Sequence, residues 1–128
     1  MKKIQVACAI IILEEKILVV QRSDTMSLPL KWEFPGGKIE SGESDEECIK
    51  REIIEELNIK IELISRLTPS RHNYPDFQIE LIPFLAKYID GVIKLAEHKK
   101  YLLLKKYELS DLDWAEADIP ILNEYLNL

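Results

Sequence analysis

A helix with defined ends constrains the fold of this chain more than any other feature of its sequence. Ser44 is followed three residues later by Glu47, a capping box that predicts where the helix begins. An apolar stripe, which must pack against another layer, recurs every four positions at Ile49, Ile53 and Leu57. Asn58 follows the stripe, and asparagine is the commonest residue after glycine in the left-handed C-cap. The sequence therefore predicts a helix over residues 44–57 with one buried face.

The segments on either side of this helix are rich in Ile, Val and Leu. Strands are expected over residues 4–13, 16–21, 32–34, 60–68, 77–89, 92–95 and 101–107. A second helix is expected over 118–127, with Asp118 as its N-cap and Pro120 in its first turn. Strands, a helix, strands and a helix in this order predict an α/β (α+β) domain, in which helices pack on a mixed β-sheet.

Residues that break regular structure set the remaining boundaries. Residues 23–31 show no clear hydrophobic period and are expected to form a loop. The run Pro35, Gly36 and Gly37 is a turn signal after the short strand that precedes it. Pro83 lies inside a long apolar run, which predicts an edge position or a bulge there.

The length and charge of the chain exclude several classes of function. A length of 128 residues suits one domain, residues 1–128. The net charge of −6 gives no positive field to attract a nucleic-acid polymer or an anionic membrane. The two cysteines, Cys8 and Cys48, are expected to be buried free thiols. The first apolar run leads into charged residues and has no cleavage site, so we expect a cytoplasmic protein.

Most of the negative charge lies in one segment, residues 36–57. It holds eight carboxylates against three basic residues and carries five of the six net negative charges. On a helix, Glu52, Glu55 and Glu56 share a face about 100° wide, beside the apolar stripe. Carboxylates this close repel one another, and a hard cation such as Mg²⁺ or Mn²⁺ removes that penalty. The segment therefore predicts a metal site, with a solvated acidic surface as the alternative.

Neighbouring residues favour the metal site. Gly36 and Gly37 have no side chains, so their backbone groups can approach a metal or a phosphate closely. Arg51 can reach Glu55 one helical turn later. This pair is either an ordinary surface ion pair or a clamp that fixes the carboxylate for metal binding.

A family resemblance emerges from the same residues. Gly37, Glu43 and the run REIIEELNI at 51–59 resemble the Nudix box, G-x(5)-E-x(7)-R-E-U-x-E-E-x-G-U. Only the last glycine differs, and Asn58 is the mildest replacement for it in a left-handed position. The segments MKKIQVACAIII, WEFPGGKIESGES and ADIPILNEYL are similar to the MutT and CTP pyrophosphohydrolase branch of the family.

The resemblance implies a fold, a reaction and a set of metal ligands. The implied fold is a mixed sheet sandwiched between helices, and the implied reaction is hydrolysis of a nucleoside diphosphate derivative with Mg²⁺, or alternatively Mn²⁺. Glu55 and Glu56 would hold metal together with the Gly36 carbonyl. Glu52 is a ligand or the general base, and Glu97, in a late loop, is the second candidate for both roles. His98 beside it is expected to be a solvated loop residue.

Within this branch, the resemblance favours a nucleoside or deoxynucleoside 5′-triphosphate, of CTP type or oxidised such as 8-oxo-dGTP, cut to the monophosphate and pyrophosphate. The residues expected to bind substrate are Arg22, Glu33, Phe34, Pro35, Gly36, Gly37, Phe77 and Asn123. Arg22 resembles an arginine that contacts phosphates, or else it is a surface residue at a strand end. Asn123 aligns with an asparagine that recognises oxidised guanine, or else it is a polar residue on an exposed helix face. Phe77 would stack on the base with Tyr74, or else it packs in the core.

Two other functions fit the family pattern. Some relatives hydrolyse ADP-ribose or dinucleoside polyphosphates, but they often carry further motifs that are missing here. Others are non-catalytic sensors, which usually lose box glutamates, whereas all of them are present in this chain. The expected partner is therefore a nucleotide substrate, bound by a monomer or a homodimer.

Overall fold

The helix expected from the sequence is α1, Asp45–Leu57, in the computed structural model, which describes residues 2–128. The Ser44 hydroxyl accepts a hydrogen bond from the Glu47 amide, and the Glu47 carboxylate accepts one from the Ser44 amide. Asn58 ends the helix in the left-handed conformation, with φ of 61°. Both predicted caps are confirmed. Met1, included in the expected domain, lies outside the described residues.

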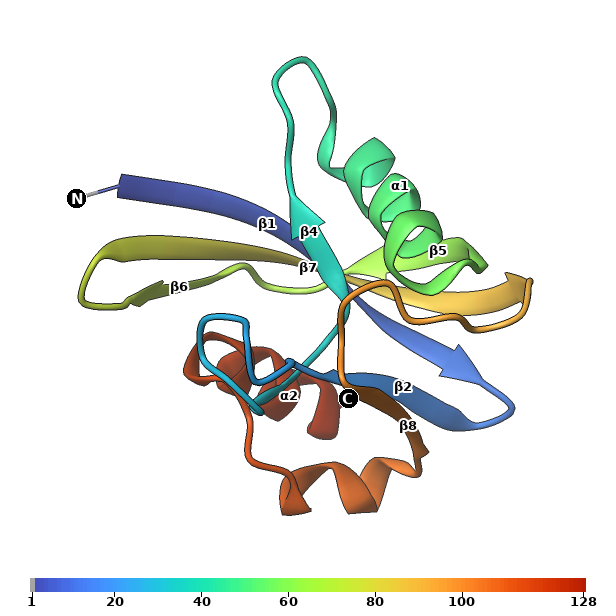
Figure 1. The fold of residues 1–128 in the computed structure, drawn as a ribbon. Coiled ribbons are helices and arrows are strands. Elements are labelled where there is room, and N and C mark those ends of the chain that lie inside the picture. Colours follow the sequence, from blue (N-terminus) through green and yellow to red (C-terminus); the bar gives the residue numbers. More distant parts are fainter. Residues whose placement is uncertain (1) are drawn as a thin grey trace.

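The strand β1, Lys2–Leu13, runs through the middle of a mixed sheet (Figure 1). It pairs in parallel with β7, Phe77–Asp90, and antiparallel with β2, Lys16–Gln21, and β4, Gly36–Lys38. The remaining strands are β3 (Trp32–Glu33), β5 (Lys60–Arg66), β6 (Ser70–Asn73) and β8 (Lys100–Leu104). Strands β3 and β8 pair with β2, whereas β5 and β6 pair with β7.

Alternate residues of β1 face two separate cores because side chains on a strand point to opposite faces. Ala7, Ala9 and Ile11 pack against the apolar stripe of α1. Cys8 and Ile10 pack on the other face, beneath the helix α2, Ile119–Leu126, and the 3₁₀ turns at Lys106–Asp111 and Glu116–Asp118. Figure 1 shows α1 and α2 on opposite sides of the sheet. The predicted class, a mixed sheet between helices, is confirmed.

Several expectations about strand positions are wrong. The turn expected at residues 35–37 contains the start of β4, where Gly36 pairs with Cys8 and Gly37 with Ala7. The strand expected at 92–95 is a loop that lies against the end of α1. The Lys94 amide donates to the Leu57 carbonyl, and the amide of Ala96, just after this segment, donates to the Glu56 carbonyl. The strand expected at 101–107 ends at Leu104 and gives way to a 3₁₀ turn. Strand β6 was not expected from the sequence.

Pro83 lies where the partner of β7 changes from β5 to β6, and the three residues 67–69 stand opposite Ile82 and Pro83, so the expected irregularity is present in the partner segment. Strand β7 lies between β1 and the pair β5 and β6, so it is internal to the sheet. The Pro83 carbonyl accepts from the Leu67 amide, in the segment that connects β5 to β6. The proline nitrogen faces the same connection, so its missing N–H costs the sheet no ladder hydrogen bond.

The start of α2 also differs in detail from the prediction. Pro120 lies in its first turn as expected, and Asp118 occupies the N-cap position. The Asp118 side chain makes no capping hydrogen bond within the helix. Its carboxylate instead accepts from the backbone amide of Phe34, 2.9 Å away. Neither helix found within residues 2–128 is long and apolar enough to cross a membrane.

Candidate active site

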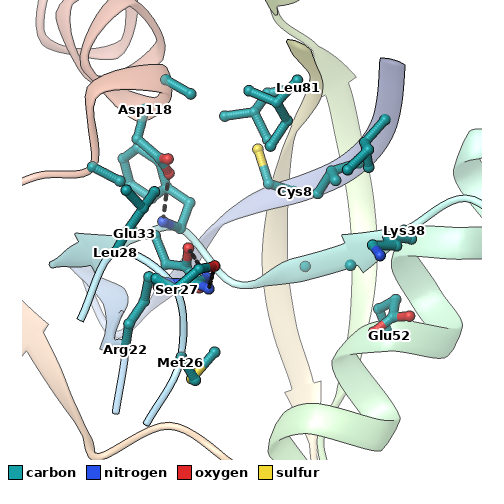
Figure 2. A pocket seen from close by; sticks show the side chains of 18 of the residues that line it. Cys8, Arg22, Met26, Ser27, Leu28, Glu33, Lys38, Glu52, Leu81 and Asp118 are labelled. Atoms are coloured by element: carbon teal, nitrogen blue, oxygen red, sulfur yellow. Dashed lines mark hydrogen bonds and ion pairs between the residues drawn. The ribbon is translucent and has the colours of Figure 1, made fainter. Parts of the chain in front are cut away.

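A cavity of about 590 Å³ opens between α1, β4 and the start of α2. Its acidic end is lined by Glu52 and Glu56 of α1 and by Glu97 of the following loop. Phe34, Tyr74, Phe77, Leu81 and Asp118 line its other end, which we call the nucleoside end after the ligand that the family resemblance implies. Figure 2 shows Glu52 and Asp118 on opposite sides of this space, with Cys8 and Leu81 between them on the sheet.

Strand β4 places Gly36 and Gly37 against α1. A Cβ atom on Gly37 would lie only 2.1 Å from the Glu52 carboxyl carbon, and one on Gly36 would lie 1.9 Å from the Ala7 carbonyl oxygen. Only glycine therefore fits at either position without a shift of its neighbours. The Glu52 carboxylate consequently lies directly on the backbone of β4, with Gly36 and Gly37 both exposed to the cavity.

Glu52 and Glu56 are both largely withdrawn from solvent. Burial raises the pKa of each carboxyl above its ordinary value. The Arg51 guanidinium opposes this rise at Glu52, and the charge of His98 opposes it at Glu56. Carboxyls in this environment have a strong need for a positive partner when they ionise.

One oxygen of Glu56 receives no hydrogen bond from any residue between 2 and 128. Its side chain is 20% exposed, and Oε2 is buried without a hydrogen bond. Within residues 2–128, no three acidic, His or Cys side chains form a ready-made ligand cluster. The residues nevertheless fit a hard divalent cation. Glu56 Oε2 receives no hydrogen bond, and the neighbouring atoms that could ligate a metal are carboxylate and backbone oxygens. Glu52, Glu56, Glu97 and the Gly36 carbonyl would hold it.

Arg51 holds the acidic helix to the loop before it. Its Nε lies 2.7 Å from Glu43 Oε2, and its NH1 lies 2.9 Å from Glu52 Oε1 and 3.0 Å from Glu55 Oε2. It also donates to the Lys38 carbonyl at the end of β4. Arg51 and Glu55 therefore form the expected ion pair, and Arg51 also contacts Glu43 and Glu52.

The nucleoside end is bounded by the loop that follows β2. Arg22 donates from NH1 to both oxygens of Glu33, at 3.0 and 3.2 Å. Its Nε and NH2 donate to the carbonyl and the hydroxyl of Ser27. The loop residues Met26, Ser27 and Leu28 line the cavity beside this pair (Figure 2). Arg22 thus lines the cavity, and its hydrogen bonds to Ser27 also fix the loop that forms one wall of it.

Asp118 is a functional candidate that the sequence reasoning missed. It is 4% exposed and lines the cavity, and among residues 2–128 its carboxylate accepts a hydrogen bond only from the Phe34 amide. Burial raises the pKa of Asp118 well above its ordinary range, and the nearby charge of Glu33 adds to the rise. The only signal in the sequence was an aspartate directly before an apolar helix, which favours a cap as readily as a site.

His98 was also misjudged. It is buried, not solvated, with Nε2 2.8 Å from Glu33 Oε2 and Nδ1 3.6 Å from Glu56 Oε2. Its loop is tied to the end of α1 by the amides of Lys94 and Ala96. Nothing in the sequence indicated that this loop would fold back against the acidic helix.

The structure brings most of the expected residues together. Those that line the cavity are Arg22, Glu33, Phe34, Gly36, Gly37, Glu52, Glu56, Phe77 and Glu97. Arg51, Glu55 and Pro35 lie outside its lining, although Arg51 and Glu55 touch the network around Glu52. Glu55 is 56% exposed. Asn123 is exposed on α2 and is also not part of the lining.

Comparison with known proteins agrees with this geometry. The model of the NUDIX domain matches residues 3–122. The chain is 31% identical to the CTP pyrophosphohydrolase of Escherichia coli (strain K12), over 100% of this chain and 95% of that protein. It is 37% identical to the 8-oxo-dGTP diphosphatase of the same strain, over 71% of each chain. The solution structure of the Nudix hydrolase MutT from methicillin-resistant Staphylococcus aureus 252 superposes with a TM-score of 0.80 at 39% identity, covering 99% of this chain and 98% of that one. The chain therefore belongs to the Nudix family.

Proposed function

We propose that this chain hydrolyses nucleoside and deoxynucleoside 5′-triphosphates to the monophosphate and pyrophosphate, with Mg²⁺ or Mn²⁺ as cofactor. One observation carries the proposal: a single cavity joins an acidic end, suited to a cation and phosphates, to an end lined by apolar and aromatic side chains. A nucleotide is the class of ligand that needs both. Relatives named CTP pyrophosphohydrolase and 8-oxo-dGTP diphosphatase support the same substrate class.

The residues of the acidic end are proposed to have different roles in phosphoanhydride hydrolysis. A bound divalent cation would neutralise charge on the phosphates and on the leaving group. The proposed metal ligands in the cavity are Glu56, Glu97 and the Gly36 carbonyl. Glu55, which lies outside the cavity lining, is proposed as a further ligand. Glu52 is the proposed base, because burial raises its pKa and Arg51 fixes its orientation. Glu97 is the alternative base.

The nucleoside end supports a base with both a donor and an acceptor on its edge. Asp118 has one oxygen committed to the Phe34 amide, and the other is available to a ligand. A carboxyl group whose pKa is raised can carry a proton, so it can donate as well as accept. The Watson–Crick edge of cytosine and the N7 edge of 8-oxoguanine both offer such a pair of groups. Phe77 and Tyr74 would pack on the base from the sheet side.

We place the enzyme in the cytoplasm, as one domain acting as a monomer or a homodimer on the nucleotide pool. Removal of damaged triphosphates from this pool would protect DNA. Two buried free cysteines, Cys8 and Cys48, are in keeping with a reducing compartment.

The test is chromatographic identification of all products, pyrophosphate included, from a panel of nucleotides incubated with Mg²⁺. The panel contains CTP, dCTP, dGTP, 8-oxo-dGTP, ADP-ribose and a dinucleoside tetraphosphate. We expect pyrophosphate from the triphosphates, with CTP-type or oxidised substrates among the best. Turnover of ADP-ribose alone, or release of orthophosphate from the triphosphates, would contradict the proposal. Glu52→Gln and Glu97→Gln, assayed side by side, separate the two candidate bases.

A further inference from the structure

One buried histidine connects the two ends of the cavity. The His98 side chain is 3% exposed and lies between two carboxylates from different parts of the chain. Its Nε2 lies 2.8 Å from Glu33 Oε2 at the nucleoside end, and its Nδ1 lies 3.6 Å from Glu56 Oε2 at the acidic end. The backbone amides of Lys94 and Ala96 hold its loop against the end of α1. The ring is therefore fixed with respect to both walls.

The contact with Glu33 continues as a chain of polar groups. Glu33 accepts from Arg22 NH1 with both carboxylate oxygens. Arg22 in turn donates to the Ser27 carbonyl and hydroxyl. Met26, Ser27 and Leu28 form one wall of the nucleoside end. Glu33 and Arg22 therefore connect His98 to this wall of the cavity.

The two ring nitrogens make different contacts. Because a carboxylate can only accept, the 2.8 Å contact is a hydrogen bond from Nε2–H to Glu33, whereas the 3.6 Å between Nδ1 and Glu56 Oε2 is too long for a hydrogen bond. Nδ1 and Glu56 Oε2 are both buried without a partner. His98 therefore packs beside Glu56 without forming a hydrogen bond to it, and its hydrogen bond is made to Glu33.

We propose that His98 is a positioning residue that fixes Glu33 and, through Glu33, the guanidinium of Arg22 and the 26–28 wall of the nucleoside end. The inference rests on the proposed function, since it assigns a role within the same cavity. It gives Arg22 a role in shaping the wall, in addition to any contact with phosphate.

The test compares His98→Gln with His98→Asn. The glutamine amide nitrogen reaches the position of Nε2 and can donate to Glu33, whereas the asparagine side chain is too short. We expect KM for the preferred triphosphate to rise about tenfold or more in His98→Asn, with kcat changed less, and to stay within about threefold of wild type in His98→Gln. Lys99→Gln, at an exposed position next to His98, is the control for the substitution itself. Binding of a non-hydrolysable triphosphate analogue in EDTA should follow the same order.

A second readout requires no nucleotide. The Arg22 Nε–H signal in ¹H–¹⁵N NMR should exchange slowly in the wild type and in His98→Gln, because the Ser27 carbonyl accepts from it. It should exchange rapidly in His98→Asn. Glu33→Gln should reproduce the KM increase, and the double variant should be no worse than either single one, because both changes break the same chain.

The outcomes separate the two proposals. Equal KM and equal Arg22 exchange in the Gln and Asn variants would overturn the role of His98, even if triphosphates are hydrolysed. Additive effects of His98→Asn and Glu33→Gln would also overturn it. If the Arg22 signal responds as expected but the wild type hydrolyses no triphosphate, the positioning chain stands and the proposed function fails.

Discussion

The guanidinium of Arg51 grips the carboxylate of Glu43 at two points, with Nε 2.7 Å from Oε2 and NH2 2.9 Å from Oε1. A bidentate contact of this kind fixes both groups more firmly than a single ion pair. Here it ties the loop before α1 to the middle of the helix. Because Arg51 also touches Glu52, the geometry of the site depends on the charge of Glu43.

The first prediction follows from this contact and concerns pH. Hydrogen bonds from Arg51 lower the pKa of Glu43 from its ordinary value of 4.5 to about 2. A lowered pKa means that the contact stabilises the folded state fully above about pH 4.5, and that this contribution is lost as the pH falls toward 2. Glu43→Gln should therefore melt below the wild type at pH 7, and the gap between their Tm values should close as the pH falls. A gap that is constant between pH 7 and 3 would contradict the assignment.

The glycines of β4 give the second prediction. A Cβ on Gly36 would collide with the Ala7 backbone, which cannot move without disturbing the β1 ladder. Gly36→Ala should therefore cost about 3 kcal/mol or more in the free energy of unfolding. A Cβ on Gly37 would collide only with the Glu52 carboxylate, a flexible side chain. Gly37→Ala should cost less than about 1 kcal/mol, yet it should lower kcat about 10- to 100-fold by displacing Glu52. Urea denaturation and steady-state kinetics on both variants would show whether the two effects separate.

The amount of the fold that the sequence predicts depends on how local each signal is. The ends of α1 were predicted correctly because Ser44, Glu47 and Asn58 act within one turn of the helix. Strands β4 and β6 were missed because their pairing partners lie far away along the chain, Gly36 with Cys8 and Ser70 with Leu81. Short polar strands of this kind have no periodicity of their own to detect.

The site shows the same division. The spacing of Glu52, Glu55 and Glu56 predicted a shared acidic face, but it did not predict which of them would be buried. Glu55 is exposed on the helix, whereas Glu56 is covered by the loop that carries His98. The burial of His98 and Asp118 depends on how the late loop and α2 pack on the sheet, and no local pattern encodes that packing.

This difference in burial is the basis of the third prediction. Glu56→Gln keeps the shape of the side chain but removes the charge that an unpaired Oε2 offers to a cation. We expect it to reduce kcat by two or more orders of magnitude and to weaken binding of Mn²⁺, measured by electron paramagnetic resonance. Glu55→Gln should have a smaller effect on both, because Glu55 is exposed and outside the cavity lining. Equal losses in the two variants would show that Glu55 turns inward to bind the metal directly.

The fourth prediction concerns the helix end that departs from the family pattern. Asn58 adopts φ of 61°, and its side chain donates to the Val92 carbonyl. Asn58→Gly should change the free energy of unfolding by less than about 1 kcal/mol, since relief of backbone strain offsets the lost hydrogen bond. Asn58→Val should destabilise by about 2 kcal/mol, because a β-branched residue resists positive φ. Identical denaturation midpoints for the two variants would contradict this account of the cap.

The last prediction concerns which residue reads the base. We expect Asp118, and not Asn123, to contact it, because Asp118 lies buried at the nucleoside end whereas Asn123 is exposed outside the lining. Asp118→Ala should lose about 1–3 kcal/mol in kcat/KM on the preferred substrate relative to other bases, and Asn123→Ala should leave the ranking unchanged. Burial raises the pKa of Asp118, so the protonated form is expected to donate to the base. Discrimination should therefore weaken as the pH rises through that pKa, and Asp118→Asn, which mimics the neutral acid, should remove this dependence. A wild-type ranking that is constant with pH, together with a full loss in Asp118→Asn, would show that the ionised carboxylate reads the base by accepting its amino group.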